Sequence, residues 1–145
     1  MPDPRVIPTV LEFLEQQVAF NRFLGIRVVE LQRGRCRIEL PFRPELVGDP
    51  GRPALHGGVL STLVDVAAGG AAMSVMDSPS DRVATIDLRV DYMRPAGAQD
   101  VVAEGTVSRT GSKVAYADVA IFHPQEPDSV LATGRVVYSV YRASK

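Results

Sequence analysis

Apolar side chains recur along the chain in two periods, and these periods predict its secondary structure. Residues 10–20 carry apolar side chains at helical spacing: Val10, Leu11, Phe13, Leu14 and Val18. Asn21 and Gly25 then interrupt the pattern. We therefore predict an N-terminal extension with one short amphipathic helix within residues 1–20.

Alternating apolar and polar positions predict most of the remaining elements. Residues 26–31 and 36–40 have the pattern of two strands joined by a turn at 32–35. Residues 41–55 contain several prolines and glycines, which predicts a long and functionally important loop. Four further strands are predicted at residues 84–92, 101–107, 114–122 and 130–141.

The most apolar stretch, residues 55–73, predicts a long buried helix. Its core face extends to residue 75 and is formed by Leu60, Leu63, Val64, Ala67, Ala71 and Val75. Gly69 and Gly70 lie inside this helix, where each costs roughly 1 kcal/mol relative to alanine. We therefore expect a close backbone-to-backbone contact there. The order helix, two strands, long helix and four strands predicts one α+β domain over residues 1–145.

Composition narrows the classes of function. The chain has 16 basic and 17 acidic residues, a balance that argues against binding of nucleic acid. It lacks an uninterrupted apolar run of the ~18 residues that a membrane helix needs, and its N-terminus lacks the pattern of a signal peptide. We expect a cytoplasmic protein that spans no membrane.

Cysteine and histidine are too scarce to suggest a metal site. Cys36 is the only cysteine, which excludes a cysteine-based zinc site, and there are two histidines. Arginines on both sides of Cys36 could lower the pKa of its thiol. We nevertheless expect an ordinary strand residue without chemistry.

The start of the long helix is the first candidate for chemistry. His56, Gly57 and Gly58 stand where a helix leaves backbone N–H groups free and carries a partial positive charge. A glycine allows a ligand oxygen to approach closely, as an oxyanion hole requires. His56 would lie at the rim, where it could position a carbonyl group or organise the loop.

Asp65 is the second candidate. A carboxylate on a buried helix needs partners, and burial would raise its pKa and make it a better base. Gly57 and Asp65 are eight residues apart, about 12 Å along a helix, so one reacting carbonyl cannot touch both groups in one subunit. If both act on it, a two-fold dimer must supply one group from each chain.

Two sequence blocks resemble those of hotdog-fold acyl-CoA thioesterases. The first comprises Gly48-Asp49-Pro50, Leu55-His56-Gly57-Gly58 and Asp65, and the second is Thr85-Ile86-Asp87-Leu88-Arg89-Val90-Asp91-Tyr92-Met93-Arg94-Pro95-Ala96. They are similar to the PaaI-like group of phenylacetate degradation and to the 4-hydroxybenzoyl-CoA thioesterases with the HGG motif. The resemblance implies a six-stranded antiparallel sheet around a long helix, in homodimers that usually pair into tetramers.

The resemblance also implies roles for individual residues. Asp65 would activate water or attack the thioester, Gly57 would supply the oxyanion-hole N–H, and His56 would lie near the thioester. Thr85 would orient the carboxylate or the water, although it falls on the polar side of its strand's alternation. Asp49 stands where many relatives carry asparagine, and an aspartate cannot donate that side chain's hydrogen bonds.

The remaining expectations concern the substrate, an acyl-CoA with a medium-chain or aromatic acyl group. Its contacts would include Asp49, Gly58 and Leu60, and its phosphates would meet Arg94 and the basic turn with Arg109, Ser112 and Lys113. No metal or cofactor is required. The alternatives are a non-catalytic acyl-CoA-binding or regulatory hotdog protein and a hotdog dehydratase or hydratase, for which no paired histidine and acid is evident.

Overall fold

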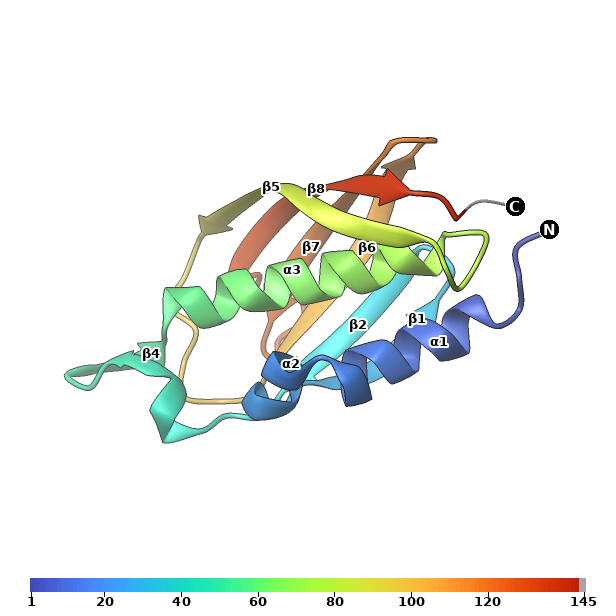
Figure 1. Cartoon of the computed structure of the whole chain (residues 1–145). Helices are drawn as coiled ribbons and strands as arrows, with labels where there is room; N and C mark the ends of the chain where they lie inside the picture. The colour runs from blue at the N-terminus through green and yellow to red at the C-terminus, as the bar shows by residue number, and fades with distance from the viewer. Residues whose placement is uncertain (144–145) are drawn as a thin grey trace.

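A six-stranded antiparallel sheet wraps around the long helix α3 (Gly57–Ser74) in the computed structural model, which describes residues 1–143 (Figure 1). The strands in spatial order are β1 (Arg27–Gln32), β2 (Arg35–Leu40), β6 (Val101–Thr110), β7 (Val114–Phe122), β8 (Ala132–Tyr141) and β5 (Arg82–Tyr92). This arrangement confirms the predicted α+β hotdog fold. The sheet leaves β1 and β5 as its two edges.

The core lies between the concave face of the sheet and α3. Strand residues on this face are fully buried, including Ile38 on β2, Ile121 on β7 and Val136 on β8. On the helix, the predicted core face is confirmed: Leu60, Leu63, Val64, Ala67 and Ala71 are buried, and Val75 packs against them half-buried.

Glycines bring the helix and the sheet close together, but not quite as expected. A Cβ on Gly70 would lie 2.5 Å from Cys36 Sγ, so this helix glycine makes room for a side chain and not for a backbone. The backbone contact is made from the sheet instead: a Cβ on Gly105 of β6 would collide with the carbonyl oxygen of Ala67. The expected close contact exists, but the glycine it requires is Gly105.

Cys36 lies on β2, as predicted, and it is also a core residue. It is fully buried beside Gly70. Burial raises the pKa of its thiol to about 12, so the neighbouring arginines do not activate it.

The N-terminal helical segment, residues 6–24, is longer than predicted. It comprises α1 (Val6–Glu12), a π-helical turn (Phe13–Gln17) and α2 (Ala19–Leu24), with Val18 extended between the last two. Asn21 does not end the helix; it is buried, and its side-chain amide donates to the Leu14 carbonyl oxygen at 3.1 Å across the break. Gly25 ends the helical segment, as predicted, and it does so in the left-handed conformation.

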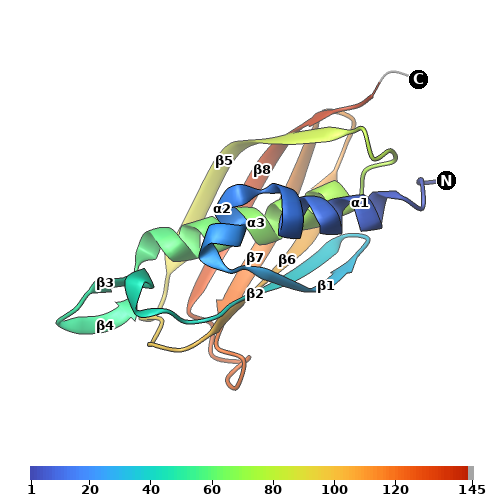
Figure 2. The ribbon, with the colours of Figure 1, turned by 60° about the horizontal axis from the view of Figure 1, so that its bottom comes forward.

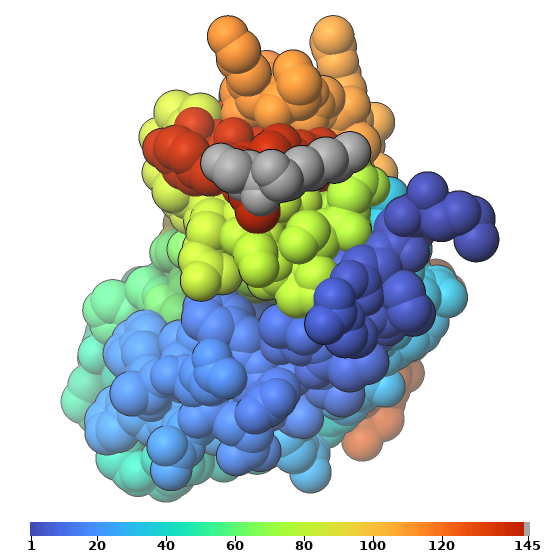
Figure 3. All heavy atoms as spheres, turned by 45° about the vertical axis from the view of Figure 1, so that its right-hand side comes forward, coloured from blue at the N-terminus to red at the C-terminus, as the bar shows by residue number. Residues whose placement is uncertain are grey.

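This segment covers the side of α3 that the sheet leaves open (Figure 2). The residues that precede this segment reach the loop after α3, where the Asp3 N–H donates to the Asp77 carbonyl oxygen at 2.9 Å. In the space-filling view the dark-blue N-terminal segment and the yellow-green loop meet on one face (Figure 3). The helix is thus enclosed between the sheet and residues 6–24.

Residues 41–55, predicted as a loop, contain regular structure. A 3-10 turn (Pro44–Leu46) leads into a small hairpin of β3 (Val47–Asp49) and β4 (Arg52–Leu55). Prolines are compatible with this hairpin because the outer edge of each of its two strands is unpaired, so a residue there needs no backbone N–H for pairing. The 3-10 turn before the hairpin holds the start of α3, since the His56 N–H donates to the Leu46 carbonyl oxygen at 2.8 Å.

By length and composition, α3 alone among the described helices could cross a membrane. Its burial under the sheet and the N-terminal segment accounts for this apolar character, because core helices share it.

Candidate active site

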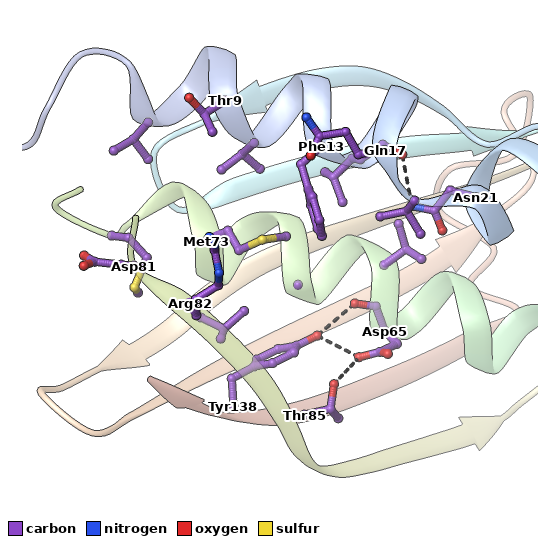
Figure 4. Close-up of a pocket in the computed structure, with 18 of the residues that line it drawn as sticks. Thr9, Phe13, Gln17, Asn21, Asp65, Met73, Asp81, Arg82, Thr85 and Tyr138 are labelled. Atoms are coloured by element: carbon purple, nitrogen blue, oxygen red, sulfur yellow. Dashed lines mark hydrogen bonds between the residues drawn. The ribbon is translucent and has the colours of Figure 1, made fainter. Parts of the chain in front are cut away.

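Two hydroxyl groups from the sheet hold the Asp65 side chain in the middle of α3 (Figure 4). Thr85 Oγ1 donates to Asp65 Oδ1 at 3.0 Å, and the Tyr138 hydroxyl lies 3.0 Å from the same oxygen. Oδ2 accepts no hydrogen bond from residues 1–143. Asp65 is half-buried and lines a cavity, so the expectation of a buried carboxylate is wrong. One oxygen is oriented and the other is available to a ligand.

Thr85 reaches Asp65 because β5 contains a β-bulge. Thr85 pairs with Tyr138, and Asp87 pairs with Val137, so Ile86 is the extra residue. Odd-numbered Thr85, before the bulge, faces the helix, whereas even-numbered Leu88 faces it after the bulge. The regular alternation that placed Thr85 on the outer face with Asp87 is therefore wrong.

Tyr138 is a site residue that the sequence interpretation missed. Its hydroxyl lies 2.8 Å from the Asp65 backbone carbonyl oxygen as well as 3.0 Å from the carboxylate. Burial, followed by the nearby Asp65 charge, raises the pKa of the phenol, so the hydroxyl stays protonated and donates. The sequence contains one indication of this role: Tyr138, with its polar hydroxyl, occupies an inward-facing position of β8 between Val136 and Val140.

The start of α3 presents one free backbone donor. The Gly58 N–H is taken, because it donates to His56 Nδ1 at 2.8 Å. The Gly57 N–H has no acceptor among residues 1–143. Since Nδ1 accepts, the proton of a neutral His56 ring lies on Nε2. The structure thus gives His56 a capping role and leaves Gly57 able to stabilise an anion.

Tyr92, at the end of β5, closes one side of this helix start. Its hydroxyl donates to the Gly57 carbonyl oxygen at 2.8 Å and lies 2.8 Å from Ser61 Oγ. The ring also lies against the position that a Gly57 side chain would take. Sequence reasoning placed Tyr92 in a family block but assigned it no contact.

Asp65 and Gly57 line different cavities of the chain. Asp65 lies in a cavity of about 890 Å³ between the N-terminal helical segment, α3 and β5. Gly57 lies in a smaller one of about 320 Å³ with Tyr92 and the segment that follows it. About 12 Å of helix separates the two residues. As expected from their spacing, one subunit does not bring them to one point.

The other predicted binding residues are dispersed. Leu60 and Arg94 line the smaller cavity beside Gly57, and Arg94 also donates to Ser129 Oγ at 2.9 Å. Asp49 lies at the hairpin tip, where its carboxylate accepts the Gly51 N–H at 2.9 Å. Neither cavity includes Asp49.

The basic turn with Arg109, Ser112 and Lys113 is exposed and lies far from the start of α3. It joins β6 to β7 near the loop that follows α3, because Arg142 contacts both the Gly111 carbonyl oxygen of this turn at 3.4 Å and Asp77 Oδ2 of that loop at 3.2 Å. Within one chain this turn is at the opposite end of the sheet from Gly57 (Figure 1).

The described residues offer no metal site, because within residues 1–143 no three His, Cys, Asp or Glu side chains gather to hold an ion. The groups available for chemistry are an oriented carboxylate beside an apolar cavity and a free N–H at a helix start. The first can take a proton or attack an electrophile, and the second can stabilise an oxyanion.

Comparison with known proteins identifies the family. Residues 53–130 match the family described as "Thioesterase superfamily". A candidate esterase of Halobacterium salinarum is 39% identical over 127 residues, covering 83% of each chain. The medium/long-chain acyl-CoA thioesterase YigI of Escherichia coli is 30% identical over 94% of each chain.

A solved structure agrees. A Shewanella oneidensis protein related to the thioesterase superfamily superposes with a TM-score of 0.80 at 27% identity, covering 93% of this chain and 95% of the other. The chain therefore belongs to the thioesterase superfamily and is a thioester hydrolase with the hotdog fold.

Proposed function

We propose that this protein hydrolyses acyl-CoA thioesters, as a member of the PaaI-like group with the HGG motif. The observation that carries the proposal is the Asp65 carboxylate, oriented by Thr85 and Tyr138 at the side of an apolar cavity of about 890 Å³. That volume lies within the ~300–1,000 Å³ typical of ligand pockets. The name of the relative YigI supports a coenzyme A ester with an aliphatic acyl group.

In the proposed reaction the thioester carbonyl oxygen accepts the Gly57 N–H. Asp65 either removes a proton from water as the water attacks the carbonyl carbon, or attacks that carbon itself. Collapse of the tetrahedral intermediate breaks the carbon–sulfur bond and expels the CoA thiolate, which takes up a proton. If Asp65 attacks, water then hydrolyses the resulting anhydride. Both routes yield a carboxylic acid and CoA, and neither requires a cofactor.

The two groups meet if two chains pair through β5. This strand is an 11-residue free edge, and such an edge can pair with a second copy. Asp65 contacts Thr85, and Gly57 contacts Tyr92. Asp65 of one chain therefore approaches Gly57 of the other when Thr85 of the first strand lies roughly opposite Tyr92 of the second. The two-fold axis would pass near Leu88.

The same pairing accounts for the expected phosphate contacts. Because the paired β5 strands run antiparallel, the Arg109–Lys113 turn of one subunit lies at the same end of the dimer as the Gly57 entrance of the other. Arg94 already lies beside Gly57 in its own chain. These cations would bind the phosphates of CoA. We further propose that two dimers pair into a tetramer, which sedimentation would measure.

A complementation experiment tests the shared site. Gly57→Pro removes the N–H and is compatible with the fold: His56 has φ −58° and ψ 136°, which a following proline requires, and proline suits the first position of a helix. Asp65→Asn and Gly57→Pro are each expected to be nearly inactive. Coexpressed, half of the dimers are mixed and each contains one intact site, so about a quarter of wild-type thiol release should return.

Sites built within one subunit would give no recovery, and that result would overturn the composite site. The matched control is coexpression of two copies of the same variant, Asp65→Asn. Recovery in that control would show that refolding and not complementation restores the activity.

Tyr138→Phe tests the role of the phenol as a positioning group. Loss of one hydrogen bond to the carboxylate is expected to lower kcat about tenfold to hundredfold with little change in KM. Tyr141→Phe is the control, because Tyr141 is exposed on the same strand. A kcat of Tyr138→Phe equal to that of the wild type would contradict the assignment.

A further inference from the structure

We infer that the larger cavity holds the acyl group as an extended chain along α3, and that the residues at its far end set the accepted chain length. This inference rests on the proposed function and adds to it the path, the length and the residues that limit them.

One face of α3 forms the floor of the path. Asp65, Gly69 and Met73 line the cavity and are four residues apart, so they succeed one another along one side of the helix. Gly69 has no side chain, which leaves the floor open between the carboxylate and Met73. Met76, just beyond the end of α3, also lines the cavity and is buried. Figure 4 shows Asp65 and Met73 separated along the helix in this order.

Apolar side chains form the two walls. The N-terminal helical segment contributes most of one wall through Val6, Val10, Phe13, Leu14, Val18 and Phe20. Val83 and Leu88 of β5 lie on the other. Phe13 points from the N-terminal segment toward α3, between Met73 and Asp65 (Figure 4). A hydrocarbon chain along this path would exchange water for apolar contacts over its whole length.

The length of the floor gives the length of the chain. Asp65 and Ser74, the last residue of α3, are nine residues apart, about 14 Å at a helical rise of 1.5 Å per residue, and Met76 lies two residues further on, so the path is about 16 Å long. An extended chain advances about 3.5 Å per three bonds, so the path accommodates about fourteen bonds. The preferred substrate is therefore a straight-chain acyl-CoA of about twelve to fourteen carbons.

Polar groups mark the far end of the path. Ser78, Asp81 and Arg82 line the cavity there, and Asp81 is already bound by Arg142 and by the Ala143 N–H. These groups favour a chain that stops at Met76, because a methyl end gains nothing among them.

The test is a profile of kcat/KM against acyl length, measured by thiol release from saturated acyl-CoAs of four to eighteen carbons. The wild-type value should rise at least tenfold from hexanoyl-CoA to lauroyl- or myristoyl-CoA and fall again at stearoyl-CoA. A flat profile, or a maximum at benzoyl- or phenylacetyl-CoA, would overturn the inference.

Two substitutions, one in the floor of the path and one in the N-terminal wall, should shorten the preferred chain. Met73 lies eight residues from Asp65, about 12 Å or ten bonds away. Met73→Trp should lower kcat/KM for myristoyl-CoA at least tenfold while hexanoyl-CoA stays within twofold. Thr9→Trp, from the exposed side of the cavity wall, should act in the same direction. Leu11→Trp is the matched control, because Leu11 lies on α1 outside the cavity and should leave the profile unchanged.

The outcomes separate this inference from the proposed function. If Asp65→Asn hydrolyses every chain length at the wild-type rate, the proposed function fails. If hydrolysis depends on Asp65 but Met73→Trp and Thr9→Trp both retain the wild-type profile, only the path along α3 fails. A clear preference for a chain ending in a second carboxylate would assign the far end to Arg82 and would also overturn it.

Discussion

Replacement of Asp65 by asparagine is expected to lower kcat for acyl-CoA hydrolysis by about a thousandfold, within the range that loss of a general base produces. Asparagine keeps the size of the side chain, and its amide oxygen can still accept from Thr85 and Tyr138, which hold Asp65 at 3.0 Å each. What it loses is the capacity to take a proton or to attack a carbonyl carbon. Thiol release at saturating substrate measures the effect.

The matched control is Asp128→Asn, which changes the same charge in the exposed connection between β7 and β8. It should keep wild-type kcat and KM. Because the site geometry is retained, Asp65→Asn should bind substrate with little change in affinity. Wild-type turnover by the folded Asp65→Asn protein would remove Asp65 from the chemistry.

The largest expected effect on stability comes from a glycine in the sheet. Gly105→Val should lower the free energy of unfolding by about 3 kcal/mol or more, because its Cβ would collide with the carbonyl oxygen of Ala67. The obstacle is the backbone of α3, which cannot turn aside as a flexible side chain can. Urea unfolding followed by far-UV circular dichroism would measure the loss.

Gly111→Ala provides the comparison for this substitution. Gly111 is exposed in the turn between β6 and β7, and the nearest atom to an added Cβ is the Val114 carbonyl oxygen at 3.7 Å. Alanine there should be neutral or stabilising by up to about 1 kcal/mol. Equal stability of Gly105→Val and the wild type would show that α3 does not pack as closely on β6 as the structure describes.

The elements of the fold could be predicted because each buries one face. Alternation located β2 and β7 almost to the residue, and the Ala- and Gly-rich helix was recognisable as the centre of the sheet. The hairpin at residues 47–55 could not be predicted, because its short strands bury little and show no alternation. The break at Val18 was also hidden, since the bond that spans it joins Asn21 to Leu14, seven residues away.

Some residues of the candidate site could be identified from local sequence, whereas others depend on contacts between distant parts of the chain. His56, Gly57 and Asp65 could be proposed as candidates from the sequence because they lie at the start of, or within, one helix, where spacing along the chain gives their relative positions. The partners of Asp65 come from other strands. Thr85 faces inward only because Ile86 is an extra residue, and a sequence pattern does not show where a bulge falls. Tyr138 lies 73 residues from Asp65, and only the tertiary fold brings the two together.

The origin of the cavity walls has a consequence for how such enzymes diversify. The groups that hold the acid come from α3, β5 and β8, whereas most of the facing apolar wall comes from residues 6–24. Under the proposed function, substitutions in this N-terminal stretch would reshape the space around the acyl chain and leave the residues proposed for proton transfer unchanged. Substrate range and catalysis would then depend on separate parts of the chain, and an engineer could vary the first by exchanging one short segment.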